Sequence, residues 1–190
     1  MIPRPGTFPL SEMTEEARSI LKFVPNLSYL SGVEVGTLRG KTAAILLLHR
    51  PGLHLACVDN WDREFLATIV DDPDDVAMAW VRNMKAWQER VKRIPLTSLE
   101  AAVIERGGDG HEDFVYIDAD HSYEATAADI AAWWPHVRPG GLLMGHDYGR
   151  SGPMGKDAGW GVAQAVGEFL AANDLELHGL EDTTWAIVKT

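Results

Sequence analysis

The sequence lacks several features that would point to particular classes of protein. Its single cysteine, Cys57, cannot form an internal disulfide and lies in the apolar run of residues 55–58, which is typical of a buried thiol in a reducing compartment. No stretch approaches the roughly 18 apolar residues of a membrane span. Residues 1–10 lack the apolar segment of a secretion signal. We therefore expect a cytoplasmic protein without a membrane anchor.

Basic residues are also scarce. The chain has 17 Lys and Arg against 28 Asp and Glu, a formal net charge of -11, and its basic residues form no cluster. Such a charge repels nucleic acid backbones and anionic membranes, so neither is expected as a partner. The 190 residues, 46% of them hydrophobic, suffice for one sizeable core. We expect a single domain over residues 1–190, and the sequence leaves a homo-oligomer open.

What the sequence does contain is a repeated alternation of apolar runs and helical patterns. The runs cover residues 33–35, 54–58, 114–117 and 142–144, with a weaker one at 94–97. Apart from Glu34 and His54, these four runs are apolar rather than alternating, as expected for parallel strands covered by helices on both faces. This alternation is typical of βαβ units. It predicts an α/β fold with a Rossmann-like, doubly wound and mostly parallel sheet.

Three helices between these runs have readable start signals or apolar faces. Asp72 and Pro73 are expected to begin one, Ser122 caps another, and a third runs from about Trp160. The apolar face of the first comprises Val76, Trp80, Met84, Trp87 and Val91, and that of the second Ile130, Trp133, Trp134 and Val137. Aromatic stripes at helical spacing are usually core packing, and we interpret these tryptophans in that way.

The C-terminal segment predicts an antiparallel hairpin. Residues 175–180 and 185–188 are strand-like and only four residues separate them. Parallel strands need a crossover of about a dozen residues or more, so these two strands must run antiparallel. A mostly parallel sheet with such an ending is unusual for an ordinary dinucleotide-binding dehydrogenase.

Two strand ends carry residues suited to a nucleoside ligand. Behind the first strand, Glu34 can accept from a ligand ammonium, and Gly36 and Gly40 permit a tight turn into a helix whose free N–H groups favour a carboxylate. Their spacing, Gly-x-x-x-Gly, differs from the Gly-x-Gly-x-x-Gly of dinucleotide sites. After the second strand, Asp59 is placed to accept both hydroxyls of a ribose, although a strand-terminal Asp is often only a turn residue.

Together these motifs resemble those of a known family. They are Glu-x-Gly-x-x-x-Gly at 34–40, Asp59, Phe-Val-Tyr-Ile-Asp-Ala-Asp-His at 114–121, and Gly140-Gly141. In this order they resemble the class I S-adenosylmethionine methyltransferases, from about Ser31 to the C-terminus. The pairing of Ile-Asp-x-Asp-His-Ser-Tyr-Glu with Gly-His-Asp-Tyr resembles small-molecule O-methyltransferases of the catechol, macrocin and cephalosporin types.

The resemblance implies a cofactor and the residues that bind it. The cofactor is S-adenosylmethionine, and the methyl acceptor is a small molecule whose identity the sequence does not disclose. Glu34, Gly36 and Gly40 would shape the methionine pocket. Thr42 would hold the carboxylate of the methionine and Asp59 the ribose, while Ser98 matches a serine near the adenine. Asp118, at the end of the fourth strand, would lie against the same ligand.

A divalent metal is also expected where the fourth and fifth strands end. Asp118, His146 and Asp147 form a partial ligand shell in which oxygen donors favour Mg²⁺ or Mn²⁺ and the imidazole leaves room for a transition metal. His146 departs from the acidic residue of the resembling enzymes. His121 lies where the catechol enzymes place a basic lysine, so we expect His121 and Asp118 to be catalytic. The alternatives are a histidine that only orders Tyr123 or the backbone, and a metal-free His146–Asp147 pair.

Other functions stay open at this stage. A nicotinamide-dependent oxidoreductase is disfavoured by the glycine spacing and the C-terminal hairpin, and a non-catalytic nucleoside-binding domain by the candidate catalytic residues. Methylation at nitrogen or carbon is not distinguished from methylation at oxygen. Residues 1–30 are expected to contribute to the acceptor side, and the glycine-rich residues 149–159 to form a mobile lid.

Overall fold

The computed structural model describes residues 14–105, 110–149 and 161–190, and their strands form one seven-stranded sheet. The strands are β1 (Leu30–Val35), β2 (Leu53–Val58), β3 (Val91–Ile94), β4 (Glu112–Ile117), β5 (Val137–Gly145), β6 (Gly179–Glu181) and β7 (Thr184–Val188). Their order is β3-β2-β1-β4-β5-β7-β6, in which β1 to β5 run parallel and β7 pairs antiparallel with both β5 and β6. The predicted fold class and C-terminal hairpin are confirmed, although the first strand of the hairpin, predicted at 175–180, is the shorter β6 at Gly179–Glu181.

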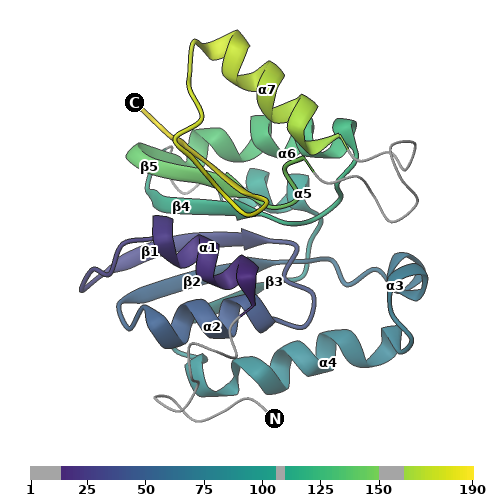
Figure 1. The fold of residues 1–190 in the computed structure, drawn as a ribbon. Coiled ribbons are helices and arrows are strands. Elements are labelled where there is room, and N and C mark those ends of the chain that lie inside the picture. Colours follow the sequence, from purple (N-terminus) through teal and green to yellow (C-terminus); the bar gives the residue numbers. More distant parts are fainter. Residues whose placement is uncertain (1–13, 106–109, 150–160) are drawn as a thin grey trace.

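Helices cover both faces of the sheet (Figure 1). They are α1 (Glu15–Phe23), α2 (Lys41–His49), α3 (Arg63–Ile69), α4 (Pro73–Met84), α5 (Ser98–Ile104), α6 (Tyr123–Trp133) and α7 (Val162–Asn173), with short 3-10 helices η2 (Lys85–Trp87) and η3 (Trp134–His136). In β4, Phe114 and Tyr116 pack in the layer of α1, α2 and α4, whereas Val115 and Ile117 pack in that of α5, α6 and α7. The runs are therefore continuously apolar because both faces are buried.

The predicted helix signals are largely confirmed, and the differences have local causes. Asp72 caps α4 with Pro73 in its first turn, and Ser122 caps α6. The regular helices α4 and α6 end at Met84 and Trp133, so Val91 lies in β3 and Val137 in β5 and not on the apolar faces of these helices. The expected strand at 94–97 is shifted to Val91–Ile94, because Thr97 and Glu100 form a capping box that starts α5.

The tryptophans predicted to be core do pack in the interior. Trp80, Trp87 and Trp133 are buried, and Trp134 is partly buried against the same core as Trp133. Cys57 is fully buried, as its apolar neighbours indicated. Within the described ranges, no helix is long and apolar enough to cross a membrane.

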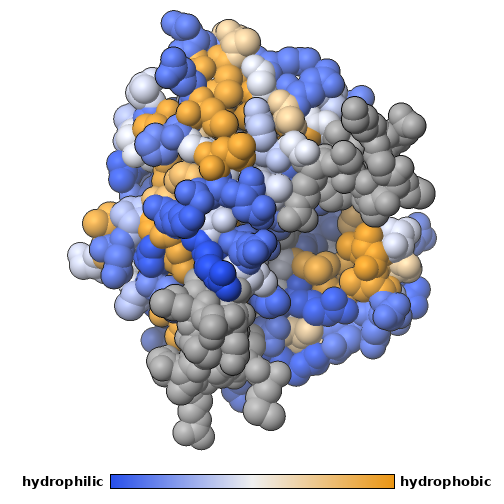
Figure 2. Space-filling model, viewed as in Figure 1, coloured by the Kyte–Doolittle hydropathy of each residue, from blue (hydrophilic) through white to orange (hydrophobic). Residues whose placement is uncertain are grey.

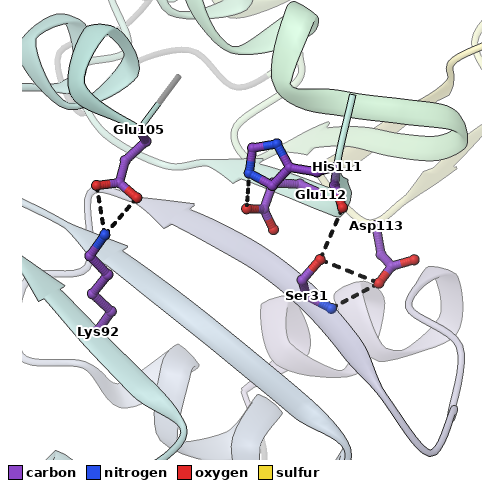
Figure 3. A network of polar contacts seen from close by, with 6 residues as sticks. All are labelled: Ser31, Lys92, Glu105, His111, Glu112 and Asp113. Atoms are coloured by element: carbon purple, nitrogen blue, oxygen red, sulfur yellow. Dashed lines mark hydrogen bonds and ion pairs between the residues drawn. The ribbon is translucent and has the colours of Figure 1, made fainter. Parts of the chain in front are cut away.

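The amino ends of the central strands are joined by polar contacts (Figure 3). The carboxylate of Asp113 on β4 accepts from the backbone N–H of Ser31 on β1 at 2.8 Å and from Nε of Arg138 on β5 at 2.7 Å. On the same side, Lys92 of β3 pairs with Glu105 at 2.8 Å. These contacts use polar side chains to hold one edge of the sheet together. The ligand-binding edge of such a fold is the opposite one, at the carboxyl ends of the strands.

Candidate functional site

The candidate residues of four strands meet at the carboxyl edge of the sheet. β1 lies between β2 and β4, and β5 is the next strand after β4. Because these strands are parallel, the segments that follow Val35, Val58, Ile117 and Gly145 leave the sheet at one edge. On the neighbouring α3, Phe65 and Ile69 expose apolar side chains, and Figure 2 shows apolar surface in this region.

The turn from β1 into α2 requires its two glycines. Gly36 has a φ of 86° and Gly40 a φ of 72°, a region that side chains with a Cβ rarely adopt. A Cβ at Gly36 would also collide with the backbone carbonyl of Asp118, and one at Gly40 would lie 2.8 Å from Cδ1 of Trp80. Gly40 is the N-cap of α2 and provides no side-chain cap, so the first N–H groups of that helix are available to an anion.

Glu34 is a buried carboxylate beneath this turn. The hydroxyl of Thr37 donates to its Oε2 at 2.6 Å. Burial raises the pKa of Glu34 from 4.5 to about 8, despite the lowering effect of the Thr37 hydrogen bond. The side chain therefore holds a proton at neutral pH. A ligand ammonium beside it would favour the ionised form.

Asp59 holds the same turn from the end of β2. Its two oxygens accept backbone hydrogen bonds from Leu38 and from Trp61, each at 2.8 Å. The turn role considered for this residue is therefore present in the structure. An ionised carboxylate offers about four acceptor positions, so two positions are left for hydroxyls of a ligand.

Thr42 and Ser98 both make contacts within the protein. The Thr42 hydroxyl donates to Oε1 of Glu16 at 2.9 Å, and the Tyr116 hydroxyl donates to the same oxygen at 3.2 Å. Glu16 therefore connects α1 to the start of α2, a contact that sequence reasoning missed. Only its place in the first turn of a helix was readable.

Ser98 lies at the start of α5 and faces α6. Its hydroxyl donates to the buried Asp129 and accepts from Nε1 of Trp133 at 2.9 Å. Burial raises the pKa of Asp129 to about 6. The roles expected for Thr42 and Ser98 toward a cofactor stay predictions.

A group of possible metal ligands forms where β4 and β5 end. Asp118, His121 and Asp147 each offer a ligand atom, and these atoms all lie within 4.8 Å of one another. His121 Nε2 is 3.4 Å from Oδ2 of Asp147. The predicted shell contained His146 where this group has His121. Two carboxylates and an imidazole are suitable donors for a divalent cation.

His146 lies beside the group and contacts both carboxylates. Its Nδ1 is 3.3 Å from Oδ1 of Asp147 and 3.7 Å from Oδ1 of Asp118. Burial lowers the pKa of His146, but the hydrogen bond with Asp147 and the charge of Asp118 outweigh it, so the pKa is raised overall. At His121 burial dominates over the charge of Asp147 and lowers the pKa. The pKa values of the two imidazoles are thus shifted in opposite directions. The lowered pKa favours the neutral form of His121, which can accept a proton.

Three further segments concern the carboxyl edge of the sheet. Thr183, in the turn between β6 and β7, contacts the loop after β5, and no sequence pattern singled it out. The proposed lid at 149–159 lies outside the described residues except for Gly149, which has a φ of 76°. Of residues 1–30, α1 lies against α2 and β7.

Comparison with known proteins identifies the family of the chain. Residues 33–148 match a family described as a methyltransferase domain. No curated protein sequence matches the chain significantly.

Several of the similar solved structures are described as O-methyltransferases. A putative caffeoyl-CoA O-methyltransferase from Staphylococcus aureus has a TM-score of 0.68 at 12% identity, over 94% of this chain and 84% of that one. An O-methyltransferase from Bacillus cereus in complex with SAH has a TM-score of 0.60 at 18% identity, over 98% and 84%. The O-methyltransferase NovP has a TM-score of 0.60 at 20% identity, over 93% and 78%. At these identities the likeness establishes the fold.

Proposed function

The chain belongs to the methyltransferase-domain family of class I S-adenosylmethionine-dependent enzymes, and from this premise we propose that it methylates a hydroxyl of a small molecule. The observation that carries the proposal is the meeting of two halves at one sheet edge. The half made of Glu34, Gly36 and Asp59 suits a nucleoside that carries an amino acid with a free ammonium and a free carboxylate. The Asp118–His121–Asp147 group suits activation of an acceptor. With a net charge of -11, a small acceptor fits better than a nucleic acid.

The residues of the first half fit S-adenosylmethionine. The N–H groups at the start of α2 would bind the carboxylate, Glu34 the ammonium, and Asp59 the ribose. The Thr42 hydroxyl would join in binding the carboxylate by donating to it in place of Glu16. Ser98 would lie on the adenine side. When bound, the cofactor supplies an electrophilic methyl group on a sulfonium. The Bacillus cereus O-methyltransferase, with the same fold, is described in complex with SAH, the demethylated product.

His121 is the proposed general base. Its Nε2 lies at the carboxyl edge, 3.4 Å from Oδ2 of Asp147, and burial lowers the pKa of the imidazole, which favours the neutral form that can accept a proton. It would take the proton of the acceptor hydroxyl as the acceptor oxygen bonds to the methyl carbon. The electron pair of the breaking carbon–sulfur bond stays on sulfur, which leaves a neutral thioether, so charge and protons balance.

We further propose that a divalent metal assists at Asp118 and Asp147, with an imidazole from His121 or His146. A bound ion would orient the acceptor and lower the pKa of its hydroxyl. Ligation and proton acceptance use the same lone pair of His121, so these two roles exclude each other. If His121 is a ligand, the ion itself must lower the pKa enough for the hydroxyl to ionise.

The test is a methyl-transfer assay on a panel of hydroxylated small molecules, with radiolabelled S-adenosylmethionine and with or without EDTA. Methylation at oxygen, identified by mass spectrometry, supports the proposal. Activity retained in full with EDTA would show that the reaction requires no metal. Calorimetric binding of NADH without binding of S-adenosylmethionine would overturn the assignment altogether.

A further inference from the structure

The turn of the C-terminal hairpin holds the loop that follows β5. Thr183 contacts both neighbours of Asp147. Its backbone carbonyl accepts a hydrogen bond from the N–H of Tyr148 at 3.0 Å, and its Oγ1 lies 3.0 Å from Nε2 of His146. The buried Asp147 is therefore flanked on both sides by residues that one threonine holds in place.

The backbone of Asp147 needs such support. It has a φ of 59°, in the left-handed region that residues with a Cβ rarely adopt. A conformation of this kind persists only where the surrounding structure fixes it. In this conformation the Asp147 carboxylate reaches two histidines, with Oδ2 3.4 Å from His121 and Oδ1 3.3 Å from His146.

The imidazole of His146 transmits the contact to the carboxylates. One ring nitrogen faces the Thr183 hydroxyl, and the other faces Asp147 and, at 3.7 Å, Asp118. A hydrogen bond at one ring nitrogen fixes the orientation of the ring and the proton at the other nitrogen. Thr183 thus determines how His146 meets both acids.

We propose that Thr183 is a positioning residue for the proposed reaction. Through His146 and the Tyr148 amide it holds the Asp147 carboxylate toward Asp118 and His121. This inference rests on the proposed function only for its consequence in catalysis, because the positioning itself can be measured on the isolated protein.

Two substitutions at Thr183 and one at its neighbour test this. Thr183→Val removes the hydroxyl with little change in shape and keeps the backbone bond to Tyr148, whereas Thr183→Ser retains the hydroxyl. Thr184→Val is the matched control, because Thr184 is buried in the same hairpin and its Oγ1 has no hydrogen-bond partner among the described residues.

The measurements are the imidazole ¹⁵N resonances of His146 and the affinity for Mn²⁺, titrated calorimetrically as manganese chloride alone. We expect Thr183→Val to shift the His146 resonances and to weaken Mn²⁺ binding by about 10- to 100-fold, the usual effect of losing such an outer contact. Thr183→Ser and Thr184→Val should behave like the wild type in both measurements.

The proposal is overturned if Thr183→Val leaves the His146 resonances at their wild-type positions, or if Thr183→Ser shifts them as much as Thr183→Val does. Failure of the proposed function gives a different result, namely a wild-type chain that does not bind S-adenosylhomocysteine. The His146 resonances still decide for or against Thr183 in that case.

Discussion

The carboxylate of Asp59 accepts a hydrogen bond of 2.8 Å from the backbone N–H of Leu38, so the acid at the end of β2 is held by the turn after β1. The same carboxylate accepts from the N–H of Trp61. The proposed ribose-binding group is thus fixed in place by backbone contacts before any ligand arrives. Removing this side chain affects both the turn and the binding of a ligand.

We expect Asp59→Ala to weaken binding of S-adenosylhomocysteine by one to two orders of magnitude, from loss of charge-assisted hydrogen bonds of about 1.5 to 3 kcal/mol. Isothermal titration calorimetry measures the affinity and thermal unfolding the stability. Asp71→Asn, at an exposed acid, is the control and should bind normally. Lower stability with unchanged affinity would make Asp59 a turn residue only.

Glu34 predicts a proton release on cofactor binding. With a pKa of about 8 it is mostly protonated at pH 7, and a ligand ammonium would drive it to ionise. Calorimetry at pH 7 in phosphate and in Tris, which differ in ionisation enthalpy, should show close to one proton released per S-adenosylmethionine bound. Glu34→Gln should abolish the release. An equal release from this variant would assign the proton to another group.

The raised pKa of Glu34 also determines how the free energy of unfolding changes with pH. The unfolded chain loses the Glu34 proton near pH 4.5 and the folded chain only near 8, so the folded state binds more protons in this window. Stability contributed by protonated Glu34 therefore falls as pH rises from 4.5 to 8. Glu34→Gln, which stays neutral, should gain stability over the wild type across this range by up to a few kcal/mol, at about 1.4 kcal/mol per unit. Urea unfolding at several pH values tests this.

Gly36→Ala should be much more damaging than the same change at Gly149. Both glycines have positive φ, but a Cβ at Gly36 collides with the Asp118 carbonyl, whereas nothing lies within 4 Å of one at Gly149. We expect Gly149→Ala to cost about 1 to 2 kcal/mol from backbone strain alone. Gly36→Ala should cost more and also lower cofactor affinity. Equal losses in chemical denaturation would contradict the close packing at Gly36.

His121→Ala should lower turnover by about 10²- to 10⁴-fold, the usual contribution of a general base, without changing cofactor affinity. His111→Ala is the matched control, since His111 pairs with Glu112 at the amino edge (Figure 3) and should retain activity. Near-normal turnover of His121→Ala would remove it as the base. A loss of Mn²⁺ binding together with activity would make it a metal ligand.

The sequence by itself determined the layers of the fold and the edge at which the site lies. Continuous apolar runs require strands buried on both faces, and a connection of four residues cannot join parallel strands. The glycines at 36 and 40 and the acids at 59 and 118 follow strand ends. Because parallel strands end at one edge, these residues had to gather there.

Only the tertiary structure decided which side chains meet at that edge. Thr42 contacts Glu16, and Thr183 contacts His146, across 26 and 37 positions of the chain. His121 joins Asp118 and Asp147 because of how α6 begins relative to β5. These contacts depend on how α1, α6 and the hairpin dock on the sheet. Local periodicity and spacing specify the elements, but long-range packing sets side-chain partners, so no sequence pattern could assign them.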